Sequence, residues 1–191
     1  MNIPIQDGKL TFEPHFYSER EAASLFTALR AELNWKEESI IIFGKEVMQP
    51  RLLAWYADEG KAYTYSGKTN EPNGWSPTLL KIKQQIEEAT KQQFNSCLCN
   101  LYRYGTDSMG WHSDDEDELG RNPVIASLSL GAMRPFKLQH KTDKEQKLTV
   151  ALNNGSLLVM SGRLQHCWKH SIPKTTKAVG ERINLTFRYI Y

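Results

Sequence analysis

The segment Arg182–Tyr189 alternates polar and apolar residues, and this pattern constrains the fold more than any other feature of the chain. Residues two apart point to the same side of a β-strand, so the alternation predicts a strand with one apolar and one polar face. Four residues share the polar face: Arg182, Asn184, Thr186 and Arg188. The backbones of the two arginines are roughly 20 Å apart, so a short dicarboxylate could lie between their side chains. The alternative is a surface strand whose arginines point into water.

A second predicted strand, Leu98–Tyr104, has an amide and two phenols on one face: Asn100, Tyr102 and Tyr104. These groups can hydrogen-bond to carboxylate oxygens. Cys97 and Cys99 lie on the opposite face and are expected to be small core residues. The polar faces of two strands together predict a cavity inside a β-barrel-like fold.

Shortly after this strand, Trp111–Glu116 contains a His-x-Asp pair, His112 and Asp114. In an extended segment residues i and i+2 point the same way, so both side chains could bind one metal ion. His170 would complete the two-histidine, one-carboxylate ligand set of non-haem Fe(II) oxygenases, which leaves positions open for a co-substrate and dioxygen. A His-x-Asp pair taken alone is more often part of a solvated loop.

Successive segments of the chain resemble the ordered motifs of the AlkB family: Asn100–Gly105, Met109–Glu116, His170–Lys174 and Arg182–Arg188. The ordered set is far more specific than any one of its parts. The resemblance extends from about Phe43 to Arg188. Its closest form is the branch that contains the double-strand DNA repair demethylases of animals and their bacterial counterparts. Members of the family are dioxygenases that depend on Fe(II) and 2-oxoglutarate and remove alkyl groups from nucleic-acid bases.

The resemblance implies a role for each matching residue. Carried over by position, the iron ligands are His112, Asp114 and His170, and these residues with Arg188 form the expected catalytic set. The expected 2-oxoglutarate contacts are Asn100, Tyr102, Arg182, Thr186 and Arg188. Arg188 is the expected salt-bridge partner of the distal carboxylate.

His166 is an alternative third iron ligand, because it stands four residues before His170 and would share a helical face with it. Ser171-Ile172-Pro173 disfavours a helix there, and the family pattern places the ligand directly before such a segment. The prediction is therefore His170.

Two tyrosines in the first half of the chain, Tyr63 and Tyr65, share a strand face and resemble the substrate lid of the family. Enzymes that act on a base extrude it and hold it between flat side chains. Aromatic residues in strands are more often core residues, and this is the expectation for Trp55 and Tyr56.

Phe43-Gly44-Lys45 resembles a feature of the double-strand-acting branch, in which Phe43 would be an apolar wedge, Gly44 a flexible hinge and Lys45 a cation near the base. A buried strand that ends in a turn is an equally good interpretation. Asp115 and Glu116 could accept hydrogen bonds from an exocyclic amine or organise the surroundings of the iron.

The net charge of +2 is too small to indicate nucleic-acid binding by itself, since phosphate binding needs a concentrated basic patch. Local clusters of lysines could supply it. One group is expected in a polar loop and the other around His170: Lys141, Lys144 and Lys147, then Lys169, Lys174 and Lys177.

A chain of 191 residues can form one domain with a sizeable core. Residues 1–94 are expected to supply helical support and the nucleotide-recognition lid, and residues 95–191 the catalytic core. A capping box at Ser18–Glu21 and Ser76-Pro77 predict the starts of two helices that pack outside the sheet. Short strands from about Asn95 onwards predict an α+β fold with a double-stranded β-helix, or jelly-roll, core.

The implied function is oxidative demethylation of N-alkylated bases in DNA, of the 1-methyladenine and 3-methylcytosine type. This reaction repairs alkylation damage and releases formaldehyde, succinate and CO2, with Fe(II), 2-oxoglutarate and dioxygen as cofactors and co-substrates. The same residues could serve a 2-oxoglutarate-dependent hydroxylase of RNA, protein or small molecules. A non-catalytic binder of alkylated nucleic acid is disfavoured, because binding alone needs no iron.

No run approaches the ~18 apolar residues of a membrane span, and the N-terminus does not resemble a signal peptide. The three cysteines are an odd count without zinc-like spacing, which fits reduced thiols. The expected protein is a soluble intracellular monomer, cytoplasmic or, in a eukaryote, nuclear. Its expected partner is alkylated DNA or RNA, and it has no expected membrane contact.

Overall fold

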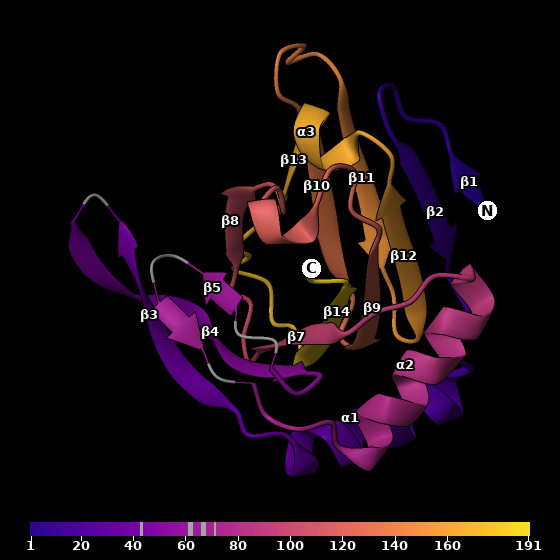
Figure 1. The fold of residues 1–191 in the computed structure, drawn as a ribbon, viewed down its shortest axis with the longest axis vertical. Helices are drawn as coiled ribbons and strands as arrows, with labels where there is room; N and C mark the ends of the chain where they lie inside the picture. The colour runs from indigo at the N-terminus through magenta and orange to yellow at the C-terminus, as the bar shows by residue number, and fades with distance from the viewer. Residues whose placement is uncertain (43, 61–62, 66–67, 71) are drawn as a thin grey trace.

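The computed structural model describes residues 1–42, 44–60, 63–65, 68–70 and 72–191. Most strands belong to two antiparallel sheets (Figure 1). The larger sheet contains, in spatial order, β1 (Asn2–Ile3), β2 (Lys9–Glu13), β12 (Ser156–Ser161), β9 (Ile125–Gly131), β14 (Arg182–Arg188), β7 (Ser96–Tyr102), β4 (Lys45–Ala57) and β3 (Lys36–Ile42). The smaller sheet contains β11 (Lys147–Leu152), β10 (Arg134–His140), β13 (Trp168–Ile172) and β8 (Met109–His112). β5 (Tyr63–Tyr65) and β6 (Lys68–Asn70) pair antiparallel in a separate two-stranded sheet.

The two sheets share a hydrophobic core. Phe136 and Leu138 from the smaller sheet pack in one cluster with Ile125, Leu158 and Met160 from the larger sheet. Two packed antiparallel sheets with helices outside them are the α+β jelly roll that the strand pattern predicts.

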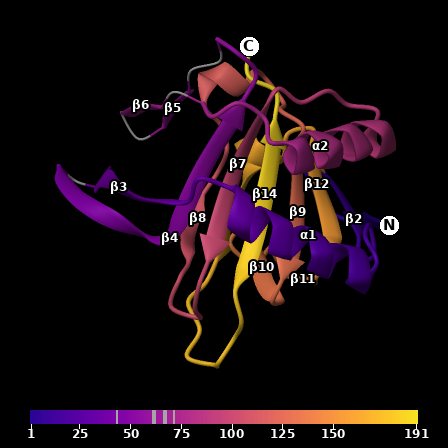
Figure 2. The ribbon, with the colours of Figure 1, turned by 90° about the horizontal axis from the view of Figure 1, so that it is seen from below.

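Two long helices cover the outer face of the larger sheet: α1 (Glu19–Glu32) and α2 (Pro77–Thr90) (Figure 2). The predicted capping box is confirmed, because the Ser18 hydroxyl accepts from the Glu21 amide while the Glu21 carboxylate accepts from the Ser18 amide. The Ser76 hydroxyl caps α2 by accepting from the Leu79 amide, and proline stands at the first position of the helix. Two shorter helices are the 3₁₀ turn η1 (Asp117–Leu119) and α3 (Leu164–Cys167).

The alternation of β14 is confirmed. Ile183, Leu185 and Phe187 are fully buried in the cluster that includes residues of α1 and α2, so the polar residues between them face the smaller sheet. Cys97 and Cys99 of β7 belong to the same helix-side cluster, as predicted. Tyr104 was wrongly placed on the polar face of β7. The strand ends at Tyr102, and Tyr104 lies in the loop beyond it with 63% of its surface exposed.

Strands from the first half of the chain also join the larger sheet. β2 pairs with β12, and β4 pairs with β7. The C-terminal part of β4 is almost entirely buried, and a short apolar run of this kind shows no period that separates strand from helix. Trp55 and Tyr56 of β4 are buried, so their assignment to the core is confirmed. Beyond its pairing with β7, β4 continues with β3 as a hairpin that projects from the body (Figures 1 and 2).

Within the described ranges, no helix combines the length and the apolar character that a membrane crossing requires.

Candidate metal centre and adjoining cavity

Two histidines meet where β8 pairs with β13. His112 and His170 are direct partners across these strands, and their ring centroids are 4.2 Å apart. Asp114 follows two residues after His112, and its Oδ1 and Oδ2 lie 3.6 Å from His112 Nε2 and 3.9 Å from His170 Nε2. One ligand atom from each of the three residues lies within 4.8 Å of the others. The predicted ligand set therefore converges on one point.

Hydrogen bonds orient these side chains. The Nδ1–H of His112 donates to the Gly110 carbonyl over 2.9 Å, which leaves Nε2 as the nitrogen available to a metal ion. The Asp114 backbone amide donates to Gln165 Oε1 (3.1 Å), and the Ser113 hydroxyl donates to the Trp168 carbonyl (2.9 Å). The loop that carries Asp114 is thus tied to α3 and β13.

The electrostatics suit a divalent cation. Burial lowers the pKa of His170 to about 3, with a further contribution from His112, so its imidazole is neutral at pH 7. Burial alone would raise the pKa of Asp114, but the attraction of Arg188, His170 and His112 outweighs it and holds this pKa well below its usual range. A neutral imidazole and an ionised carboxylate are the protonation states that metal binding requires.

His166 is not part of this group of ligand atoms. It lies on α3 and is exposed, whereas His170 lies on the following strand and is buried. The chain between the two histidines is extended from Trp168 onwards, so they do not share a helical face.

A cavity with about 390 Å³ of empty space, including its open mouth, adjoins the three ligands. Side chains from both sheets line it, among them Tyr102 and all four polar residues of β14: Arg182, Asn184, Thr186 and Arg188. The polar face of β14 therefore points into a cavity and not into solvent. Thr186 Oγ1 donates to Asn184 Oδ1 (3.2 Å), and Asn184 in turn donates to Ser127 Oγ (2.8 Å).

Arg182 is a buried cation with unused donors. It is 1% exposed, its Nη2 donates to Ser129 Oγ over 2.9 Å, and its Nε and Nη1 have no hydrogen-bond partner in the described part of the chain. Burial lowers its pKa to about 10, Tyr102 opposes this shift and Arg134 adds to it, so Arg182 stays charged at pH 7. None of the ion pairs among the described residues includes Arg182. Such a group fits an incoming carboxylate.

Arg188 lies at the metal end of the cavity. Its Nη2 is 3.1 Å from Asp114 Oδ1, and both side chains are buried. The expected contact of Arg188 with a distal carboxylate stays a prediction, because this arginine already forms an ion pair with a predicted metal ligand. Arg182 lies at the opposite end of β14 and is the alternative candidate for that contact.

Tyr102 and Asn100, the other predicted co-substrate contacts, sit opposite β14. Tyr102 pairs with Arg182, and the guanidinium carbon of Arg182 lies 5.1 Å from the centre of its ring. Asn100 pairs with Asn184 but does not line the cavity directly. Its Oδ1 accepts from Arg51 Nε (2.8 Å), and its Nδ2 is buried without a hydrogen-bond partner in the described residues.

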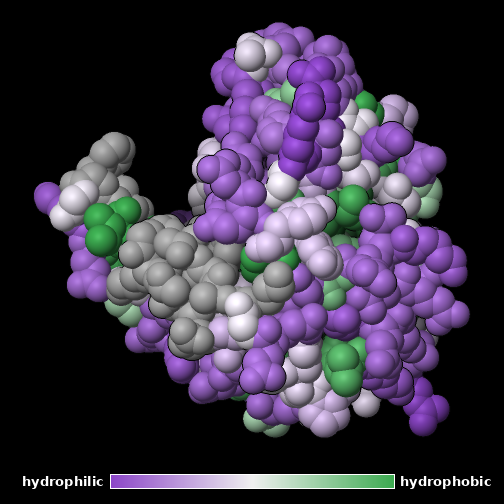
Figure 3. Space-filling view, in the orientation of Figure 1, coloured by the Kyte–Doolittle hydropathy of each residue, from purple (hydrophilic) through white to green (hydrophobic). Residues whose placement is uncertain are grey.

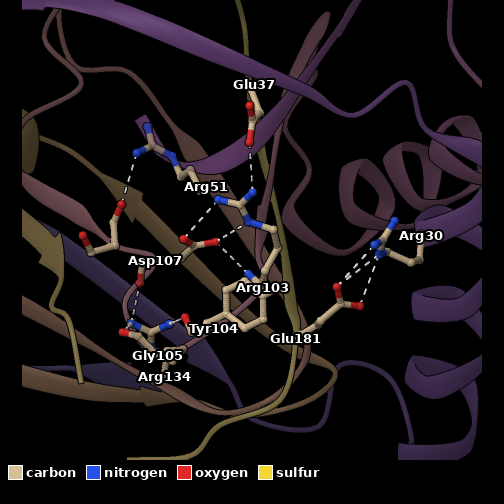
Figure 4. A network of polar contacts seen from close by, with 10 residues as sticks. Arg30, Glu37, Arg51, Arg103, Tyr104, Gly105, Asp107, Arg134 and Glu181 are labelled. Atoms are coloured by element: carbon tan, nitrogen blue, oxygen red, sulfur yellow. Dashed lines mark hydrogen bonds and ion pairs between the residues drawn. The ribbon is translucent and has the colours of Figure 1, made fainter. Parts of the chain in front are cut away.

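Two buried arginines support this region and escaped prediction (Figure 4). Arg51 of β4 donates to Asn100, to the Ser108 carbonyl and to Gln49 Oε1. Arg134 of β10 donates to the carbonyls of the 104–107 loop and of Pro173, the last over 2.7 Å. Single arginines inside strands carry no spacing pattern, so the chain offers no sequence signal for either.

The predicted substrate-side residues are only partly described. Phe43 lies outside the described residues. Gly44 forms the turn between β3 and β4 in the left-handed region (φ 75°), and Lys45, the first residue of β4, is exposed. Tyr63 and Tyr65 lie in β5, paired with Asn70 and Lys68 of β6, and their side chains are outside the description.

Apolar side chains flank the β3–β4 turn. Ile41, Val47 and Met48 are 58%, 43% and 53% exposed. Figure 3 shows hydrophobic surface near the end of the projecting hairpin. Large exposed apolar residues that gather at one place are typical of a binding surface.

The two acids that follow Asp114 differ in their surroundings. Asp115 is exposed, and Lys141 Nζ lies 3.1 Å from its Oδ2 while also donating to the Gln165 carbonyl. Glu116 is half-buried, and its Oε2 is buried without a hydrogen-bond partner in the described residues. Among the described residues, one carboxylate oxygen of Glu116 therefore has no donor, whereas Asp115 is paired with Lys141.

Comparisons with known proteins agree with this geometry. The profile of the 2OG-Fe(II) oxygenase superfamily matches residues 9–188. "Alpha-ketoglutarate-dependent dioxygenase alkB homolog 3" of Bos taurus is 46% identical over 187 residues, which cover 93% of this chain and 65% of that protein. The Homo sapiens protein of the same name is 42% identical, with 98% and 68% covered. "DNA oxidative demethylase ALKBH2" of Homo sapiens is 37% identical, with 91% and 70% covered.

The chain spans about two thirds of the length of these relatives. Among solved structures, that of OsALKBH1 superposes with a TM-score of 0.68 at 14% identity and covers 97% of this chain and 100% of that chain. At such low identity this likeness concerns the fold alone, and it confirms the predicted jelly-roll architecture.

Proposed function

This chain belongs to the AlkB family of Fe(II)- and 2-oxoglutarate-dependent dioxygenases, and from that premise we propose that it removes alkyl groups oxidatively from the nitrogen atoms of nucleic-acid bases. One observation carries the proposal. The metal-ligand group of His112, Asp114 and His170 and the buried cation Arg182 line the same cavity, so one site could hold an ion and a dicarboxylate together. The names of the relatives, which include a DNA oxidative demethylase, support alkylated DNA as the substrate.

Bound Fe(II) and 2-oxoglutarate would activate dioxygen to hydroxylate the N-alkyl carbon, and the hydroxylated group then leaves as formaldehyde while 2-oxoglutarate becomes succinate and CO2. His112, Asp114 and His170 would hold the ion. Arg182 Nε and Nη1 would offer two donors to the distal carboxylate of 2-oxoglutarate.

Arg188 maintains the charge state of the metal site. Its ion pair with Asp114 keeps this carboxylate ionised and fixes which way it points. The hydrogen bond from His112 Nδ1–H to the Gly110 carbonyl fixes the orientation of the imidazole. Rigidly oriented ligands of this kind set both the affinity for the ion and its geometry.

The apolar wall of the cavity excludes water from the reacting atoms. The rings of Phe136 and His170 have centroids 5.0 Å apart, and Leu152, Met160 and Ile172 line the same space. Exclusion of water strengthens the electrostatic interactions inside and protects a reactive oxidant from side reactions.

On the substrate side, we assign the base contacts to Tyr63, Tyr65 and Glu116 and the strand contacts to Phe43, Gly44 and Lys45. The unused buried oxygen of Glu116 suits an exocyclic amine of adenine or cytosine. Asp115 keeps its predicted role only if its pairing with Lys141 opens. The exposed apolar residues beside the β3–β4 turn support a role for this hairpin in contacting unstacked bases.

The test is formaldehyde release from methylated oligonucleotides, single-stranded and duplex, DNA and RNA, with Fe(II) and 2-oxoglutarate present and then each omitted in turn. We expect release only when both are present. Turnover of 2-oxoglutarate without formaldehyde would overturn the nucleic-acid substrate and favour hydroxylation of a protein or small molecule. The two-part division at residue 94, the monomeric state and a cytoplasmic location stay predictions.

A further inference from the structure

The four strands of the smaller sheet contain no aspartate or glutamate, and the structure describes all four of them completely. They do contain three lysines: Lys137 on β10, Lys147 on β11 and Lys169 on β13. Lys137 and Lys147 are exposed and Lys169 is half-buried. This sheet is therefore cationic along strands that hold two of the three metal ligands.

The strand register places the lysines on the face opposite the cavity. Leu138 pairs with both His170 and Leu148 on the inner face and is 1% exposed. Gln139, the next residue, pairs with both Lys147 and Lys169, so these three side chains form one row across the outer face. With strands about 4.8 Å apart, the backbones of Lys147 and Lys169 are separated by roughly 10 Å. Lys137 lies on the same face, two residues from Gln139 along β10.

A large aromatic residue extends this row to the edge of the sheet. Trp111 lies on the edge strand β8, is 47% exposed, and has the ammonium of Lys169 5.4 Å from its ring centroid. It directly precedes the metal ligand His112 in the strand, so the two side chains point to opposite faces. An exposed tryptophan beside spaced cations can stack a base while the lysines contact phosphates.

We propose that the lysine face, defined as Trp111, Lys137, Lys147 and Lys169, binds the single-stranded nucleic acid that flanks the target base. This inference rests on the proposed function, because it assigns a path to the strand once its alkylated base occupies the cavity. Charge complementarity selects the occupant: the face offers three cations and no carboxylate to a polyanion. One aromatic platform among separated lysines suits stacked bases better than a membrane surface, which favours a broad apolar face.

The inference is tested by the binding of a fluorescent, unmethylated 20-nucleotide single strand to the full chain, measured by anisotropy between 50 and 200 mM salt. The variant is Lys137→Glu with Lys147→Glu. The matched control is Arg20→Glu with Lys81→Glu, which makes the same charge change at exposed positions on α1 and α2. We expect the face variant to bind at least tenfold more weakly. The slope of log affinity against log salt should fall by about 1.4, since each single-strand phosphate contact contributes about 0.7.

The tryptophan is tested in the same assay. Trp111→Ala should weaken binding about fivefold or more, and Trp111→Phe should retain most of the affinity because a flat ring remains. The loss should also grow as the strand is lengthened from five to twenty nucleotides.

Wild-type affinity and salt slope in the Lys137/Lys147 variant would overturn the inference, as would an equal loss in the Arg20/Lys81 control. Lysine-dependent binding to phosphatidylserine vesicles without binding to the oligonucleotide would overturn the choice of partner. Anisotropy measures binding and needs no turnover. A protein that binds the strand through the lysine face but releases no formaldehyde would therefore contradict the proposed reaction and support the lysine face.

Discussion

Replacement of Arg182 by methionine should separate co-substrate binding from stability. Arg182 is a buried cation whose Nη2 donates to Ser129, and its Nε and Nη1 have no hydrogen-bond partner among the described residues. Methionine has a similar length and no charge to bury, so the Arg182→Met protein should be as stable as the wild type or more stable.

The same substitution should greatly weaken the binding of 2-oxoglutarate. A buried carboxylate that loses its cationic partner costs about 3–5 kcal/mol, which corresponds to an affinity loss of roughly 100- to 4,000-fold. At a concentration of 100 times its Kd, 2-oxoglutarate should stabilise the wild type by about 2.7 kcal/mol, a rise in Tm of roughly 5–10 °C for a chain of this size. Thermal unfolding without oxygen, with Mn(II) in place of Fe(II), should show this rise for the wild type and none for Arg182→Met.

Arg134→Met is the matched control. Arg134 is equally buried, but its Nη1 and Nη2 donate to the carbonyls of Tyr104, Gly105, Asp107 and Pro173. Its loss leaves buried acceptors unpaired at about 1–3 kcal/mol each and should lower the Tm without co-substrate by several degrees. The reasoning would be refuted if Arg182→Met bound 2-oxoglutarate normally, or if it lost as much stability as Arg134→Met.

Three further outcomes are expected. His112→Ala should abolish formaldehyde release and Fe(II) binding while the protein stays folded, as checked by metal analysis and circular dichroism. Asp114→Ala should abolish turnover and also lower the free energy of unfolding by about 3–5 kcal/mol in denaturant titrations, because it breaks the buried ion pair between Asp114 and Arg188. Glu116→Gln should raise the KM for methylated adenine or cytosine about tenfold or more, with little change in the KM for 2-oxoglutarate. The control Asp115→Asn removes only an exposed ion pair and should change either KM less than threefold.

Periodicity in β14 predicted which four residues share its polar face, because alternate residues of a strand point to one side. It left open whether this face meets solvent, and the structure shows that it lines a cavity. The periodicity does not show, however, which end of the strand lies near the predicted metal ligands. Which arginine lies beside Asp114 depends on how the loop after β8 packs in space, and only the structure shows that this is Arg188. The sequence pattern therefore predicted the residues that line the cavity but not the order of the two arginines along it.

Other features depend on contacts between distant segments. Arg51 and Arg134 donate to backbone carbonyls of loops far away in the sequence, and Arg51 also donates to the Asn100 side chain of β7, so no local spacing identifies them. The pairing of β4 with β7 was hidden because the end of β4 is buried on both faces and lacks alternation. The ligands His112 and Asp114 were predictable because their spacing is local, and His170 because its motif matches the family.

The most direct test of the account compares succinate and formaldehyde produced from a single-stranded oligonucleotide with one methylated base, in the wild type and in His112→Ala. The account predicts that the wild type releases the two products in equal amounts and that the variant releases neither. Succinate that forms at the same rate with methylated and unmethylated strands, and without formaldehyde, would contradict the claim that this cavity demethylates nucleic-acid bases.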